Sequence, residues 1–73
     1  MKPTEQAFLE FAARTLKVEH PTLDLAYGDV PEWDSVMQIL LVMKFQAEYG
    51  VDVPLSKVPE LKTLRDFYGM LDE

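Results

Sequence analysis

The sequence contains no cysteine and a single histidine, His20. The lack of cysteine excludes disulfides and thiolate metal sites, and one histidine is too few for the usual histidine-pair metal motifs. A chain of 73 residues can form one small domain, here taken as residues 1–73. The core of so small a domain is marginal without disulfides, a metal or well-packed helices. Helix packing is therefore the expected source of stability.

Long apolar runs and positive charge are also scarce. Gln38 interrupts the longest apolar stretch and Lys44 closes it, so no segment reaches the length of a membrane span. The N-terminal "MKPTEQAFLEF" lacks the layout of a signal peptide, so we expect a cytoplasmic protein without membrane insertion. A net charge of −6 makes nucleic acid a poor partner and favours steering toward basic protein surfaces.

Catalytic constellations are missing from the sequence as well. No histidine–carboxylate pair, glycine-rich phosphate loop or group of metal ligands can be recognised. His20 stands beside Pro21 in a polar segment, which is typical of a solvated turn residue rather than a catalytic base. We therefore expect neither an enzyme nor a metal site.

Hydrophobic periodicity and capping residues predict an all-α fold, a small bundle of three to four helices. The predicted helical stretches are about Thr4–Lys17, Ser35–Tyr49 followed by Gly50, a short turn within Leu55–Leu61, and Leu64 to about Leu71. The long connection of residues 18–34 contains Pro21, Gly28 and Pro31, which break regular structure. Its apolar residues predict that it packs along the domain: Leu23, Leu25, Tyr27 and Val30.

The second predicted helix has apolar residues on two sides. One stripe consists of Val36, Leu40, Met43 and Ala47. The other, on nearly the opposite side, consists of Val42, Phe45 and Tyr49, flanked by Leu41. Such a helix is either buried on both sides or keeps one side for a partner. Periodicity does not distinguish the two arrangements.

The boundary "PEWDSVMQILLVMKF" places Asp34 and Ser35 at the start of this helix. Aspartate and serine are both favoured N-cap residues, each contributing about 1 kcal/mol, so either could simply begin the helix. Trp33, just before them, is interpreted first as packing the loop onto the bundle and second as acting beside a functional group.

The wider stretch "WDSVMQILLVMKFQAEYGVDVP" resembles the acyl carrier protein family, including its peptidyl and aminoacyl carrier relatives. The matching parts are Asp34-Ser35-Val36, Tyr49-Gly50 and Val51 to Pro54, and "ELKTLRDFYGML" is similar to the closing segment of the family. The resemblance runs without gaps from Asp34 to Leu71. The first helix and the long loop fit in length and character.

This resemblance implies that Ser35 is the attachment point of 4′-phosphopantetheine, with Asp34 as the flanking motif residue. A phosphopantetheinyl transferase would take the group from coenzyme A, and its thiol would hold an acyl or aminoacyl thioester. The implied protein is a discrete, monomeric carrier whose partners are the transferase, a loading enzyme and downstream biosynthetic enzymes. The alternative is an unmodified carrier-like adaptor that works by protein–protein contact.

The resemblance also implies that Val36, Leu40, Met43 and Ala47 form the partner-docking face. Positions Ile39, Val42, Phe45 and Tyr49 are then expected in the core. The sequence departs from the family pattern in three places. Apolar side chains replace the acids usual at Leu40 and Ala47 in fatty-acid carriers, Glu32 replaces a common glycine, and Val36 replaces leucine. We therefore expect partners from a specialised pathway that dock through apolar contact, with Asp29, Glu32 and Asp34 as steering charges.

Overall fold

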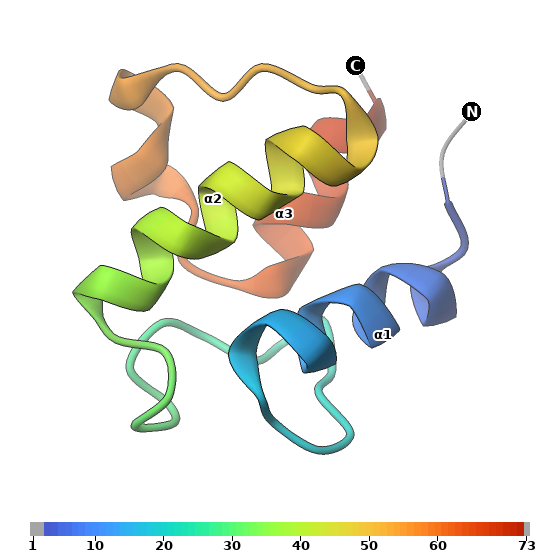
Figure 1. Ribbon diagram of the computed structural model, residues 1–73, viewed down its shortest axis with the longest axis vertical. Helices are drawn as coiled ribbons and strands as arrows, with labels where there is room; N and C mark the ends of the chain where they lie inside the picture. The colour runs from blue at the N-terminus through green and yellow to red at the C-terminus, as the bar shows by residue number, and fades with distance from the viewer. Residues whose placement is uncertain (1–2, 73) are drawn as a thin grey trace.

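A computed structural model describes residues 3–72 and shows a small helical bundle (Figure 1). Its helices are α1 (Glu5–Leu16), α2 (Ser35–Tyr49), the 3₁₀ helix η1 (Leu55–Glu60), α3 (Leu64–Gly69) and the 3₁₀ turn η2 (Met70–Asp72). The helix α2 crosses in front of α3 in this view, and α1 lies below both. The predicted all-α fold is confirmed within the described residues.

The helix α1 begins and ends where its capping residues place it. The Thr4 side chain accepts a hydrogen bond from the Ala7 amide, which satisfies one of the donors that lack an intrahelical partner. The helix ends at Lys17, which adopts a left-handed conformation at φ 60° and ψ 43°. The buried face of α1 consists of Phe8, Phe11, Ala12 and Leu16, spaced as an amphipathic helix requires.

The helix α2 has the bounds that the sequence predicts, Ser35–Tyr49. Gly50 terminates it in a left-handed conformation at φ 63°, which glycine adopts without the steric cost that a Cβ brings. At 1.5 Å per residue this helix is ~22 Å long and spans the domain. It therefore forms the frame on which the rest of the chain packs.

The connection between α1 and α2 contains no helix, yet it is held to the C-terminal part of the chain. The Tyr27 amide donates to the Lys62 carbonyl at 2.7 Å, and the Leu64 amide donates to the Leu25 carbonyl at 3.0 Å. An isolated antiparallel bridge joins Ala26 to Thr63. Leu23 is buried in the core, so the prediction that this loop packs along the domain is confirmed.

The C-terminal elements follow their sequence signals. Pro59 lies inside η1, which stays a single 3₁₀ segment because proline does not continue a regular α-helix. The capping box at the start of α3 is present, with Thr63 accepting from the Asp66 amide and Asp66 accepting from the Thr63 amide. The α-helical part ends at Gly69, two residues earlier than predicted, and the chain continues as η2.

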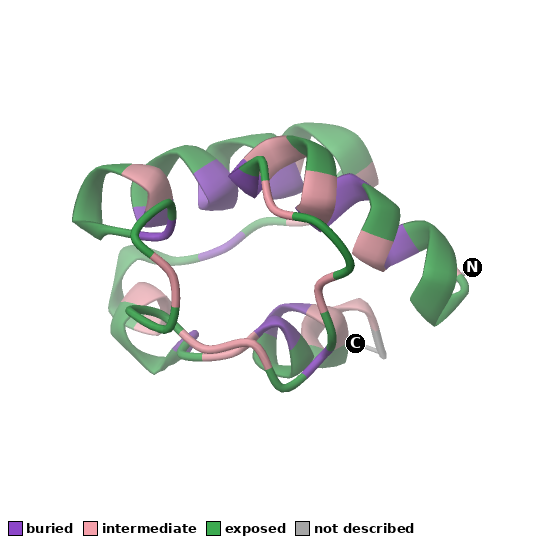
Figure 2. Cartoon of the chain, turned by 90° about the horizontal axis from the view of Figure 1, so that it is seen from below, coloured by how far each residue is buried: buried purple, intermediate pink, exposed green. Residues whose placement is uncertain are grey.

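Aromatic rings form the centre of the core. Phe45 is fully buried and lies 5.3 Å from Phe67 between ring centroids, at a near-perpendicular 78°. Phe8 meets Phe45 from α1 at 6.2 Å and 85°. Edge-to-face pairs of this kind contribute about 0.5–1.5 kcal/mol beyond the area they bury. Figure 2 shows the buried segments on the inward sides of the helices and the exposed ones outside. The aromatic pairs thus join all three α-helices.

Candidate functional site

At the start of α2, one residue caps the helix and the next keeps an exposed hydroxyl, a division that the sequence alone did not determine. Asp34 is the N-cap, and its Oδ1 accepts a 2.9 Å hydrogen bond from the Met37 amide. Ser35 is the first helical residue, and it is exposed. Within the described part of the chain, its hydroxyl makes no hydrogen bond. Ser35 is therefore not needed as a cap, and its hydroxyl is accessible from solvent.

The residue before this pair is anchored in the core. Trp33 is 1% exposed, and its indole Nε1 donates a 2.7 Å hydrogen bond to Oε1 of Gln38, one turn into α2. The Nε2 of Gln38 donates to the carbonyls of Leu61 at 3.0 Å and Val58 at 3.4 Å. The packing role predicted for Trp33 is confirmed. The buried role of Gln38 is not visible in the sequence, where Gln38 only interrupts an apolar run.

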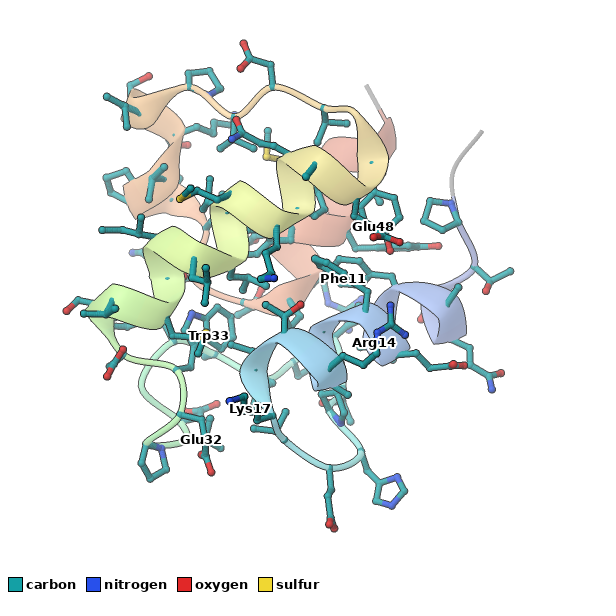
Figure 3. All side chains as sticks on the ribbon, in the orientation of Figure 1. Phe11, Arg14, Lys17, Glu32, Trp33 and Glu48 are labelled. Carbon is teal, nitrogen blue, oxygen red and sulfur yellow. The ribbon has the colours of Figure 1, made fainter. Side chains whose placement is uncertain are left out.

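The acidic residues around the site differ in what they do. Asp29 closes a turn, since its Oδ2 accepts a 2.9 Å hydrogen bond from the Ala26 amide. Glu32 is exposed in the loop before Trp33, and Figure 3 shows it below the start of α2. Asp34 is engaged in capping but remains exposed. All three carboxylates therefore lie in the exposed part of the loop that leads to Ser35.

The two apolar stripes of α2 have different environments. Leu41, Val42 and Phe45 are buried and Tyr49 is partly buried, so this side faces the core. The opposite stripe is exposed: Val36 at 75%, Met43 at 59%, and also Leu40 and Ala47. The helix is thus not buried on both sides. Its exposed stripe leaves apolar side chains in contact with water.

The expectation that Ile39 lies in the core is wrong. Ile39 is 62% exposed because Gln38, its neighbour, takes the inward position between Trp33 and the Leu61 carbonyl. Ile39 instead lines a groove of about 380 Å³ between α2 and η1, together with Met43 and Leu55. Leu55 is 89% exposed. The sequence signal for Leu55 was an apolar residue directly after Pro54, where a turn begins on the surface.

Other kinds of site find no support in residues 3–72. No group of three or more histidine, cysteine, aspartate or glutamate side chains is arranged to hold a metal ion among them. No helix in this range is both long and apolar enough to cross a membrane. His20 is exposed in the loop after α1, as predicted for a turn residue.

Comparison with known proteins identifies the class to which this site belongs. Residues 32–71 match the family model described as "Phosphopantetheine attachment site". The acyl carrier protein of Rickettsia bellii is 28% identical over 57 residues, which cover 78% of this chain and 70% of that protein. Acyl carrier proteins of two Tropheryma whipplei strains are 36% identical over 44 residues, covering 60% of this chain and 54% of theirs. No solved structure matches the chain.

The matched segment begins at Glu32, includes the whole of α2 and extends to Leu71, more than half of the 73 residues. The chain therefore belongs to the acyl carrier protein family. It is a phosphopantetheine carrier and not an enzyme, and its cofactor is covalently attached 4′-phosphopantetheine. Its partners as a member of this family include a phosphopantetheinyl transferase and biosynthetic enzymes.

Proposed function

We propose that Ser35 is the residue that carries the 4′-phosphopantetheine arm. The observation that supports this best is the division of labour at the start of α2, where Asp34 caps the helix and the Ser35 hydroxyl remains exposed. Helix geometry leaves the first amides of α2 without intrahelical acceptors, and the positive end of the helix dipole favours a phosphate there. The residues present therefore fit a phosphodiester at Ser35.

Attachment consumes the Ser35 hydroxyl and one phosphoanhydride bond of coenzyme A. The serine oxygen forms a bond to the phosphorus next to the pantetheine, the anhydride breaks, and adenosine 3′,5′-bisphosphate leaves. The serine proton passes to a base of the transferase. The attached arm supplies a terminal thiol that holds an acyl or aminoacyl group as a thioester. This chain contributes the attachment residue, and its lack of cysteine leaves that thiol without a competitor.

Partner enzymes dock, in this proposal, on the exposed stripe of Val36, Leu40, Met43 and Ala47. The stripe begins one residue after Ser35 and extends along α2, so a docked enzyme would face the attachment residue. Its apolar character favours partners with apolar docking sites, as in a specialised acyl, polyketide or aminoacyl pathway. The carboxylates of Asp29, Glu32 and Asp34 supply long-range attraction to basic partner surfaces.

The first experiment is an intact-mass measurement after incubation with coenzyme A and a phosphopantetheinyl transferase of broad specificity. We expect the parent protein to gain one phosphopantetheinyl group and the Ser35→Ala variant to gain none. Circular dichroism of both proteins before the reaction establishes that each is folded.

Two results contradict the proposal. A mass gain by the Ser35→Ala variant would place the arm on another residue. A folded parent that gains no mass would instead favour the alternative, an unmodified adaptor that acts through its exposed α2 surface.

A further inference from the structure

A second groove lies on the other side of α2, between α1 and α2. It has a volume of about 590 Å³, and Phe11, Met37, Leu40 and Ala47 give it an apolar lining. Figure 3 shows Phe11 between the ribbons of the two helices, with Lys17 near the end of α1 and Glu48 on α2. The groove shares Leu40 and Ala47 with the exposed stripe but does not include Ile39, Met43 or Leu55.

The charge of this groove is opposite to that of the whole protein. Arg14, Lys17 and Lys44 line it, against a single acid, Glu48. The sequence has only seven Lys and Arg residues against 13 Asp and Glu, and three of the seven line this groove. Within residues 3–72, none of the three cations forms an ion pair. Their charges are therefore available to a ligand.

The C-terminal end of α1 favours two of these cations, Arg14 and Lys17, whereas no helix end favours Lys44. The negative end of the α1 dipole favours Arg14 in the last turn and Lys17 at the C-cap. Lys17 occupies a left-handed position, at φ 60°, where glycine or asparagine is the usual residue. Lys44 lies in the middle of α2, where no helix end attracts a cation. The positive charge thus comes from both walls of the groove.

We propose that the groove between α1 and α2 binds an acidic amphipathic segment of a partner protein. Apolar side chains of the segment would cover Met37, Leu40 and Ala47, and its aspartates or glutamates would pair with Arg14, Lys17 and Lys44. This inference extends the proposed function by naming the chemistry of a partner contact. It does not depend on Ser35 carrying the arm, since the groove is formed by the protein alone.

The positive charge of the groove favours a protein segment over the carried acyl group as its occupant. A carboxylic acid bound as a thioester has lost the carboxylate that would use these cations. An apolar chain would gain nothing from three unpaired charges, which cost more to desolvate than apolar side chains. An amphipathic helix with acidic residues along its edges would place apolar side chains on the apolar lining and carboxylates beside the three cations.

The test uses the full chain without transferase treatment and two synthetic peptides. One is an amphipathic helix of about 12 residues, ~18 Å long, with leucines on one face and glutamates along both edges. The second has glutamine in place of every glutamate. Fluorescence anisotropy measures their dissociation constants, and amide chemical shifts locate the binding site. We expect only the acidic peptide to bind well, with shifts at Phe11 and Ala47 and weaker binding at high salt.

A matched pair of variants then tests the cations. Lys17→Gln/Lys44→Gln should weaken binding about tenfold, equivalent to ~1.4 kcal/mol, because exposed ion pairs each contribute up to about 1 kcal/mol. Lys57→Gln/Lys62→Gln makes the same change in net charge outside the groove and should weaken binding less than about twofold. All four residues are at least partly exposed, so both variants should fold.

Three outcomes overturn the proposal. Equal binding of the two peptides would show that the groove acts only as an apolar surface. Equal losses of affinity in the two double variants would show that the effect comes from net charge alone. Chemical shifts confined to Ile39, Met43 and Leu55 would move the binding to the other groove. Each of these results is independent of whether Ser35 is modified, so a failure here is distinguishable from a failure of the attachment proposal.

Discussion

The indole Nε1 of Trp33 donates a 2.7 Å hydrogen bond to Oε1 of Gln38, and both side chains are buried. The Gln38 amide nitrogen continues the connection to the Leu61 carbonyl at 3.0 Å. One glutamine thus joins the loop before Ser35, the helix that begins at Ser35, and the segment leading into α3. Since the buried groups in this network are satisfied, the network restricts the positions of all three.

Replacing Gln38 by leucine should destabilise the fold by at least ~2 kcal/mol. The leucine fills a similar volume but leaves the Trp33 N–H and the Leu61 carbonyl unpaired in the core, and each buried unpaired group costs about 1–3 kcal/mol. Urea unfolding followed by tryptophan fluorescence measures the change. Gln6→Leu on the exposed side of α1 is the control and should stay within about 0.5 kcal/mol of the parent. Similar stability of the two variants would contradict the network.

Substitutions at Ser35 and Asp34 should affect stability differently. Asp34→Ala removes the side chain that caps α2 and should cost about 1 kcal/mol. Ser35→Ala should change the free energy of unfolding by less than about 0.5 kcal/mol, because the Ser35 side chain is exposed and does not cap the helix. Thermal unfolding of both variants gives the comparison. The reverse order of effects would restore Ser35 as the helix cap.

Tyr49 should make the protein sensitive to alkaline pH. Burial, and next the nearby Glu48 carboxylate, raise the pKa of Tyr49 above its ordinary value of 10.0. In the unfolded chain the phenol loses its proton near pH 10, whereas in the folded protein it retains the proton to higher pH. The contribution of Tyr49 to the free energy of unfolding is thus fully present below pH 10 and is lost as the pH rises through the pKa of Tyr49 in the folded protein.

The Tyr49→Phe variant should therefore lose less stability than the parent when the pH is raised above 10. Unfolding in urea at a series of pH values measures this difference in slope. Below pH 10 the two proteins should show the same pH dependence. A parent and variant with identical slopes at high pH would show that Tyr49 does not cause the alkaline sensitivity.

Leu40→Glu should weaken docking of partner enzymes if the exposed stripe of α2 is their contact surface. A charge placed within an apolar contact must be desolvated, and a central interface position of this kind typically costs more than 1 kcal/mol, or about a fivefold to tenfold rise in KM. The measurement is the KM of a phosphopantetheinyl transferase for the carrier. Gln6→Glu adds the same charge on α1 and should leave KM unchanged. An unchanged KM for a folded Leu40→Glu protein would count against docking on this stripe.

Local signals in the sequence predict most of the helical architecture. Thr4, Gly50 and the Thr63–Asp66 capping box mark helix ends through contacts within three or four residues, so their effect can be inferred without tertiary structure. The bounds of α2 agree with prediction for this reason. The end of α3 differs because Gly69 weakens the last turn and the chain narrows to a 3₁₀ turn.

The candidate site was less predictable because its geometry depends on distant residues. Gln38 faces the core because its side chain bonds the Trp33 indole and the Leu61 carbonyl, two groups that are far apart in the sequence. Periodicity assigns neither Gln38 nor Ile39 to an apolar stripe, and the family resemblance placed Ile39 in the core, where Gln38 lies instead. The cationic groove likewise joins residues from α1 and α2 that no local pattern connects.

The loop between α1 and α2 contains no helix, yet hydrogen bonds tie it to the start of α3. The Tyr27 amide donates to the Lys62 carbonyl, and the amides of Leu64 and Arg65 donate to carbonyls of the loop. These bonds break only when the loop separates from α3. In hydrogen exchange, the loop amide at Tyr27 should therefore exchange together with the start of α3, as one cooperative unit. The segment leading to Ser35 would then move only at the free-energy cost of partly unfolding the domain, which makes its position a property of the whole fold.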